Sequence, residues 1–218
     1  MEDTSLNSPQ NLKKLKDCIE LVHNTAHEFE LVGTRNTLFG RFSQLTTSHC
    51  SGVQVLCENK LPASAFSLLR PLFETSCRGL WVYWCATEDQ LERLSSRKEK
   101  FNWKSIEKLA KQIDDKVKHS DGALTKIWQL HGNELHGLTH GGVEAISLSY
   151  FNPSVISISA TTMQLHQIMQ LVANILFLNF MTLIYASNRH DLSPKLETLG
   201  KMIMDWYQDH LTEQTQQR

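Results

Sequence analysis

Residues 133–142, with the sequence NELHGLTHGG, carry two histidines one helical turn apart, His136 and His140. A histidine changes charge close to neutral pH, so a pair of imidazoles can transfer protons or hold a metal ion. His140 comes just before Gly141 and Gly142, where the dipole of a helix favours a cation and the glycines let another backbone or a phosphate approach. These histidines are the first candidates for general acid and base chemistry.

A second set of candidates lies on the apolar segment 61–86, whose only charged residues are Arg70, Glu74 and Arg78. Their i, i+4 spacing places them in one stripe beside the apolar face of a helix. Burial of an unpaired charge is costly. The stripe has two guanidinium groups and one carboxylate, so one positive charge needs another partner. That cation can pair with an internal acid or bind a phosphate. A purely structural Arg–Glu ladder explains the same spacing.

Several interpretations of the histidine stripe stay open. A helical wheel puts His136, His140 and Asn133 opposite the apolar side, which predicts a solvated face, a dimer interface or a groove facing the charged helix. His131 falls on the apolar side and is expected at the core or its edge. His136 and His140 also have zinc-pair spacing, with Glu74 as a third ligand, but the internal glutamate of H-E-x-x-H is missing. No serine or cysteine nucleophile motif and no phosphate-binding glycine loop is present.

The elements that must position these residues are almost all helices, so the sequence predicts an all-α fold with one domain over 1–218. N-terminal helices are expected over 8–60, a core bundle with the candidate site over 62–190, and a C-terminal helix and tail over 193–218. Proline and capping residues predict the helix starts, and Gly141 predicts a helix end. The starts are Ser8-Pro9, Thr34, Pro62, Thr87, Asn102, Ser120-Asp121 and Ser193-Pro194. The helix from Pro62 to about Ala86 is expected to kink at Pro71.

The segment 143–158 departs from the helical pattern. Ile146, Leu148 and Tyr150 alternate with small or polar residues, and Ile156 and Ile158 do so after an Asn-Pro turn. This pattern predicts a small β-hairpin or extended flap.

Composition narrows the class of protein. The chain has 218 residues, 41% of them hydrophobic, which suits one sizeable core. Lys and Arg total 22 against 23 Asp and Glu, so no overall charge draws the chain to nucleic acid or an acidic membrane. The five cysteines form no C-x-x-C pair and are expected to be reduced. The polar, acidic N-terminus excludes a secretory or mitochondrial signal, which predicts a cytoplasmic protein.

Residues 161–188 contain no charged side chain and are long enough to span a bilayer. Amides recur along the first half at helical spacing, which a lipid-facing helix would not favour. They are Gln164, Gln167, Gln170 and Asn174. We therefore expect a central buried helix and no membrane partner.

The combination of LLRPLFE and ELHGLTHGG resembles a group of uncharacterised bacterial all-α proteins, which in turn resembles the HEPN superfamily. HEPN proteins are helical, usually dimeric, and often metal-independent ribonucleases of toxin–antitoxin, abortive-infection and related defence systems. Their motif is an arginine, four to six residues, then a histidine. His140 matches that histidine, whereas Asn133 stands where the family has arginine. Arg70 would then have to supply the cation from another helix.

The resemblance implies an RNA-cleaving or RNA-binding homodimer of a bacterial defence or toxin–antitoxin system, with an antitoxin or defence component as partner and without metal or cofactor. In this hypothesis His140 is the general base or acid, and His136 is a second proton-transfer group or a phosphate contact. Arg70 stabilises the charge on the reacting phosphorus, Glu74 orients Arg70 or His140, and Asn133 positions the phosphate. The alternatives are a non-catalytic helical module that binds a protein or a ligand, and a metal-dependent hydrolase using His136 and His140. The RNA hypothesis requires His140 and Arg70 to face a common space.

Overall fold

The computed structural model describes residues 9–96, 100–117, 121–142, 149–152, 155–158 and 162–216, with side chains for 10–96, 100–117, 121–142 and 166–208. The protein has an all-α fold, as the sequence predicts. The helices are α1 (Pro9–Ala26), α2 (Thr34–Glu58), α3 (Pro62–Ser67), α4 (Leu69–Trp84), α5 (Glu88–Ser96), α6 (Ile106–Lys116), α7 (Ala123–His140), α9 (Thr162–Ser187), the 3-10 turn η1 (His190–Leu192) and α10 (Ser193–Gln216).

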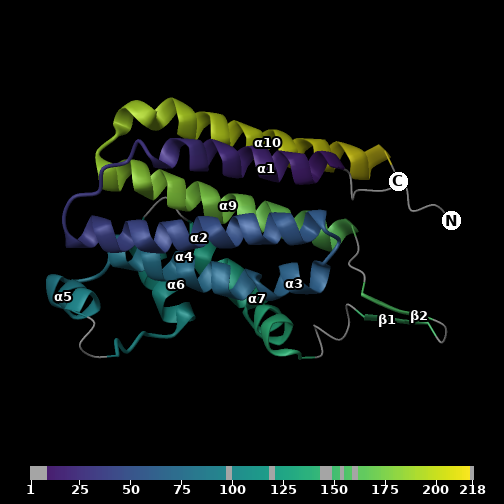
Figure 1. Cartoon of the computed structure of the whole chain (residues 1–218), viewed down its shortest axis with the longest axis horizontal. Coiled ribbons are helices and arrows are strands. Elements are labelled where there is room, and N and C mark those ends of the chain that lie inside the picture. Colours follow the sequence, from purple (N-terminus) through teal and green to yellow (C-terminus); the bar gives the residue numbers. More distant parts are fainter. Residues whose placement is uncertain are drawn as a thin grey trace.

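The helices form layers on either side of α2 and α9. Figure 1 shows α1 and α10 above these two helices, and α4, α6 and α7 below them. α2 packs against α4 and α9, and α7 packs against α3, α4 and α6. One hydrophobic core runs through the layers, from Leu15 in α1 to Trp206 in α10. The two polar stripes predicted from sequence therefore lie on α4 and α7, which are packed neighbours.

α9 is the central buried helix that its composition predicts. It packs against α1, α2, α4 and α10, and Val172, Leu176 and Phe180 are fully buried. Among the described helices it is the one long and apolar enough to cross a membrane, and 61% of that apolar window is buried inside the bundle.

The predicted helix from Pro62 to Ala86 is two helices rather than one kinked helix. α3 ends at Ser67 and α4 begins at Leu69. Pro71 has no N–H to donate to the carbonyl of Ser67, and its ring excludes that carbonyl from the helical position. The proline therefore breaks the helix at Leu68.

The start of α6 also differs from the prediction. The cap is Ser105, whose hydroxyl accepts from the backbone N–H of Lys108 at 3.5 Å, rather than Asn102. Trp103 packs edge-to-face on Trp81 and Phe101, which holds the chain before Ser105 outside the helix. One face of α6 is buried in the bundle. That face comprises Ile106, Leu109, Ala110 and Ile113.

Two further helix ends follow from local sequence. Gly141 adopts a left-handed conformation with φ of 70°, and the backbone N–H groups of Gly141 and Gly142 donate to the carbonyl of Gly137. The predicted glycine end of α7 is thus confirmed. Thr87 and Gln90 form a reciprocal cap at the start of α5, as predicted for Thr87.

Two short strands follow α7. β1 (Ser149–Asn152) and β2 (Val155–Ile158) pair antiparallel, with Ser149 opposite Ile158. Residues 143–148 and 153–154 lie outside the described residues. The predicted hairpin or flap over 143–158 as a whole therefore stays a prediction.

All five cysteines are free thiols. Cys18, Cys50 and Cys77 are buried, and burial raises the pKa of Cys50 to about 12. A thiol with so high a pKa stays protonated at neutral pH and is a poor nucleophile. The cysteines therefore belong to the packing of the core.

Candidate functional site

The charged stripe of α4 is a partly buried ladder centred on Glu74. One oxygen of Glu74 accepts from Nε of Arg70 at 2.8 Å, and the other accepts from Nη2 of Arg78 at 2.9 Å. The side chains of Arg70, Glu74 and Arg78 are 22%, 17% and 32% exposed. Partial burial strengthens such pairs and fixes the arginine planes in place.

Arg70 reaches from this ladder to the histidine stripe of α7. Its Nη1 group donates to Nδ1 of His136, and the ring centroids of His136 and His140 are 4.6 Å apart. The structure thus brings together four of the five predicted site residues, Arg70, Glu74, His136 and His140. We call these four residues the Arg–His cluster.

The break at Pro71 supplies a docking point for the end of α7. The carbonyl of Ser67, which Pro71 leaves without its helical donor, accepts from the hydroxyl of Thr139 at 3.4 Å. The same hydroxyl lies 2.9 Å from the carbonyl of Leu135 in its own helix. The turn that carries His140 is therefore tied directly to the end of α3, just before α4 begins.

The start of α7 is held from α6. Both carboxylate oxygens of Asp114 accept hydrogen bonds from α7. The backbone N–H of Leu124 donates to one oxygen at 3.4 Å. The backbone N–H and the hydroxyl of Thr125 donate to the other at 2.8 and 2.7 Å. A carboxylate at a helix N-terminus satisfies free N–H groups and complements the dipole. Between the two ends, Trp128 of α7 stacks on Phe73 of α4, with ring centroids 6.0 Å apart. α7 is thus fixed along its length against α4.

The contacts of Arg70 and His136 define what each can still bind. Since the guanidinium N–H donates, Nδ1 of His136 accepts and the proton of the neutral ring lies on Nε2. Nη2 of Arg70 makes no hydrogen bond to any residue in the described part of the chain, so it can pair with an anion. His140 is exposed on the last turn of α7.

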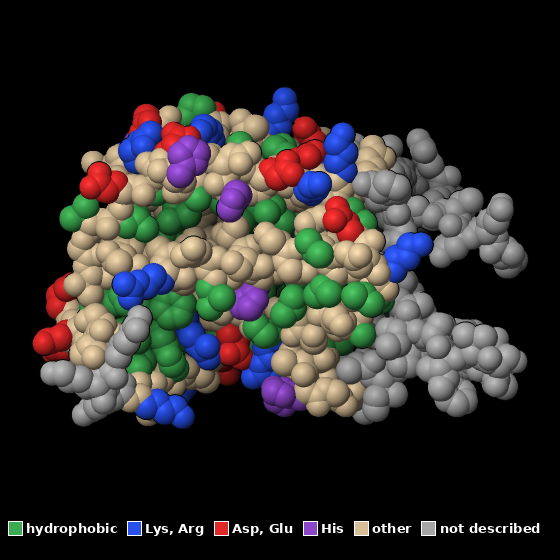
Figure 2. Space-filling model, in the orientation of Figure 1, with side chains coloured by type: hydrophobic (Ala, Val, Ile, Leu, Met, Phe, Trp, Pro, Cys, Tyr) green, Lys and Arg blue, Asp and Glu red, His purple; other side chains and the backbone are tan. Residues whose placement is uncertain are grey.

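Figure 2 shows charged side chains and a histidine gathered on the surface over α4 and α7, in the lower half of the view. The arrangement offers a fixed cation, a fixed N–H donor and a proton-transferring imidazole on one accessible surface.

Arg78 has a different environment from Arg70, although both bind Glu74. Its guanidinium lies over the ring of Trp103, 5.6 Å from the centroid, and its Nε is buried without a hydrogen-bond partner among the described residues. Each arginine of the stripe therefore has a partner besides Glu74. Arg70 binds the imidazole of His136, and Arg78 lies over the indole of Trp103. Arg78 serves packing, and Arg70 belongs to the candidate site.

Asn133, the fifth predicted residue, is exposed on α7, one turn before His136. No hydrogen bond joins it to a residue that the structure describes. Its helical spacing leaves it on the same side of α7 as His136.

A metal site built on Glu74 is not supported. Both of its oxygens are taken by arginines, and no group of three His, Cys, Asp or Glu side chains suited to a metal ion occurs within the described ranges. His136 is also engaged at Nδ1 by Arg70.

His131 lies at the edge of the core, on the apolar side of α7 where the helical wheel places it. Its side chain is 50% exposed, and its Nδ1 lies 3.2 Å from a carboxylate oxygen of Glu134. Both residues line a cavity on the opposite side of α7 from the Arg–His cluster. Sequence reasoning missed this cavity, although Gln167, Gln170 and Asn174, which it singled out as an amide row, line it too.

Comparison with known proteins gives one match. Residues 43–209 match a family described as "Family of unknown function (DUF6988)". No curated protein and no solved structure matches the chain. The match covers well over half of the sequence and includes all of α3 to α9, with the two stripes. The chain therefore belongs to the DUF6988 family of unknown function.

Proposed function

We propose that the protein cleaves RNA without a metal ion, as a HEPN-like ribonuclease whose site is the Arg–His cluster. One observation carries the proposal. Arg70 of α4 binds His136 of α7, and His140 lies beside His136, so a cation and two imidazoles from separate helices meet at one surface.

The reaction needs a base, an acid and a cation. His140 removes the proton from the 2′-hydroxyl of the RNA, whose oxygen attacks the neighbouring phosphorus. The bond from phosphorus to the 5′-oxygen breaks, and His140 returns the proton to that oxygen. The products are a 2′,3′-cyclic phosphate and a free 5′-hydroxyl.

The cluster assigns the remaining roles. The free Nη2 of Arg70 pairs with a non-bridging phosphate oxygen and stabilises the charge that develops on it. Of the two roles expected for His136, the phosphate contact is better supported, since Nδ1 is occupied and Nε2 carries the proton. Glu74 orients Arg70 rather than His140, because its contacts are with the arginines. Asn133 holds a neighbouring phosphate of the chain.

The exposure of both histidines supports a polymeric substrate. His136 and His140 are exposed on α7, so a strand of RNA can reach them without opening the bundle. The proposal includes a cytoplasmic homodimer acting in a bacterial defence or toxin–antitoxin system, with a partner protein, and a flap over 143–158 that follows the site directly in sequence.

The test is cleavage of a 5′-labelled single-stranded RNA by the purified protein in excess EDTA. We expect His140→Ala to lower the rate by about 10²- to 10⁴-fold, the usual contribution of a general acid or base. His190→Ala is the matched control, since His190 is also exposed but lies in η1, where it packs on Tyr185. The product of the wild type should end in a 2′,3′-cyclic phosphate.

Expression in bacteria gives a second readout of the same proposal. The wild type should slow growth and degrade total RNA, and His140→Ala should do neither. Intact RNA with the wild type in both assays, or equal cleavage by His140→Ala and the wild type, would overturn the proposal.

A further inference from the structure

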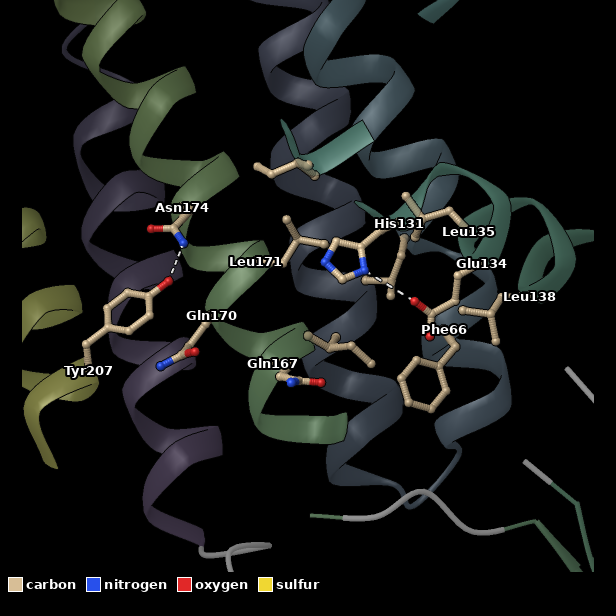
Figure 3. Close-up of a pocket in the computed structure, with 13 residues that line it drawn as sticks. Phe66, His131, Glu134, Leu135, Leu138, Gln167, Gln170, Leu171, Asn174 and Tyr207 are labelled. Atoms are coloured by element: carbon tan, nitrogen blue, oxygen red, sulfur yellow. Dashed lines mark hydrogen bonds and ion pairs between the residues drawn. The ribbon is translucent and has the colours of Figure 1, made fainter. Parts of the chain in front are cut away.

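A cavity of about 350 Å³ lies on the side of α7 away from the Arg–His cluster. Figure 3 shows it between α7 and α9, with Phe66 of α3 at one side and Tyr207 of α10 at the other. Ligand pockets span roughly 300 to 1,000 Å³, so this one suits a compact molecule.

The walls of the cavity are mainly apolar. Leu135 and Leu138 of α7 and Ile168 and Leu171 of α9 line it. Among the residues that line it there is no lysine or arginine, and the one carboxylate, Glu134, is paired with His131. An anionic ligand would find no counter-charge here, and burial of an unpaired charge is costly.

Three amides of the cavity come from one stripe of α9. Gln167, Gln170 and Asn174 line it at helical spacing. Nδ2 of Asn174 donates to the hydroxyl of Tyr207 at 2.6 Å, which holds that amide in place at the α10 side (Figure 3).

Gln170 is the unusual member of this stripe. It is only 9% exposed, and its buried Nε2 has no hydrogen-bond partner among the described residues. Buried amide N–H groups are nearly always paired, because an unpaired one loses its bonds to water without replacement. Because Gln170 lines the cavity, rotation of its side chain can bring this buried donor to a ligand that supplies the acceptor.

We propose that this cavity is a binding site for an uncharged, mainly apolar organic molecule with a carbonyl group that accepts a hydrogen bond from Nε2 of Gln170. A two-ring lactam has this chemistry and a suitable size. The site uses no residue of the Arg–His cluster, so it is independent of the RNA proposal.

Three probes of similar shape test the proposal, namely 2-quinolinone, naphthalene and naphthalene-2-carboxylate. Dissociation constants come from ligand-observed NMR titrations of the whole protein. We expect 2-quinolinone to bind about fivefold to tenfold more tightly than naphthalene, the usual contribution of one hydrogen bond. The carboxylate should bind most weakly of the three.

Two variants locate the binding. Gln170→Leu should keep naphthalene binding and remove the preference for 2-quinolinone. Leu171→Trp should fill the cavity and block both probes, while the control Leu178→Trp, on the same helix but outside the lining, should leave binding unchanged. Circular dichroism confirms that each variant is folded.

The opposite results are equally definite. Equal affinity of the wild type for 2-quinolinone and naphthalene, or no binding of either, would overturn the proposal. So would full binding by a folded Leu171→Trp variant, or an unchanged preference for 2-quinolinone in Gln170→Leu.

Discussion

The two sides of α7 contrast in how their polar groups are satisfied. On the α4 side, Arg70 binds both Glu74 and His136, and His140 beside them is exposed to water. On the α9 side, the cavity is largely apolar and contains a buried amide of Gln170 without a partner. A prearranged set of charges suits the binding of a charged, solvated substrate, whereas a largely apolar wall with one unpaired donor suits a neutral ligand. One helix can thus serve two chemistries through its two faces.

The largest expected difference is between the two arginines that share Glu74. Arg70→Lys keeps the positive charge but loses the planar fork, so we expect RNA cleavage to fall about 10²-fold, as for removal of one donor to a reacting phosphate. Arg78→Lys should change the rate by less than about threefold, because Arg78 lies over Trp103 rather than at His136. Cleavage assays on both variants in EDTA make the comparison. Equal losses would mean that the whole ladder, rather than Arg70, serves the site.

The next largest effect is on the stability of the protein, because the start of α7 holds both faces of the helix in position. Asp114→Ala removes the acceptor of three hydrogen bonds to Leu124 and Thr125, which should lower the free energy of unfolding by about 2 kcal/mol. Urea denaturation followed by circular dichroism measures it. The matched control is Asp115→Ala, whose carboxylate is exposed and pairs with Lys111. A variant as stable as the control would show that α7 is held by its packing alone.

The smallest effect concerns the end of α7 beside His140. Thr139→Val removes the hydroxyl that donates to the Ser67 carbonyl, and we expect a loss of about 1 kcal/mol in the free energy of unfolding. Thr198→Val on α10 is the control, because its hydroxyl bonds only to Pro194 in its own helix. If both threonine variants unfold at the same urea concentration, the contact to Ser67 does not hold α7 in place.

Local sequence was sufficient for most helix ends. Pro62, Gly141 and the Ser193-Pro194 pair mark helix ends that the structure has, because proline and glycine act through their own backbone geometry. The break at Leu68 and the start of α6 at Ser105 were missed. The break follows from Pro71, which predicted a kink rather than two helices, whereas the start of α6 depends on the tertiary packing of Trp103, which no local pattern reports.

The site was predictable in its residues but not in its contacts. The spacing of Arg70, Glu74, His136 and His140 identified two polar stripes, yet that the stripes meet depends on how α4 and α7 pack. The wheel put His131 at the core or its edge, and the structure has it at the edge, beside a cavity that a helical wheel cannot predict. The amide row on α9 was the available signal for that cavity, and it was interpreted only as evidence against a membrane span.

The central claim is that Arg70 and His140 act on one phosphate. A double-mutant cycle tests it directly, with cleavage rates of a defined RNA in EDTA for the wild type, Arg70→Ala, His140→Ala and the double variant. Residues that act as a unit give non-additive losses, so the double variant should be about as slow as the slower single variant. A double variant slowed by the product of the two single losses would show that the residues act independently, which would contradict a shared site.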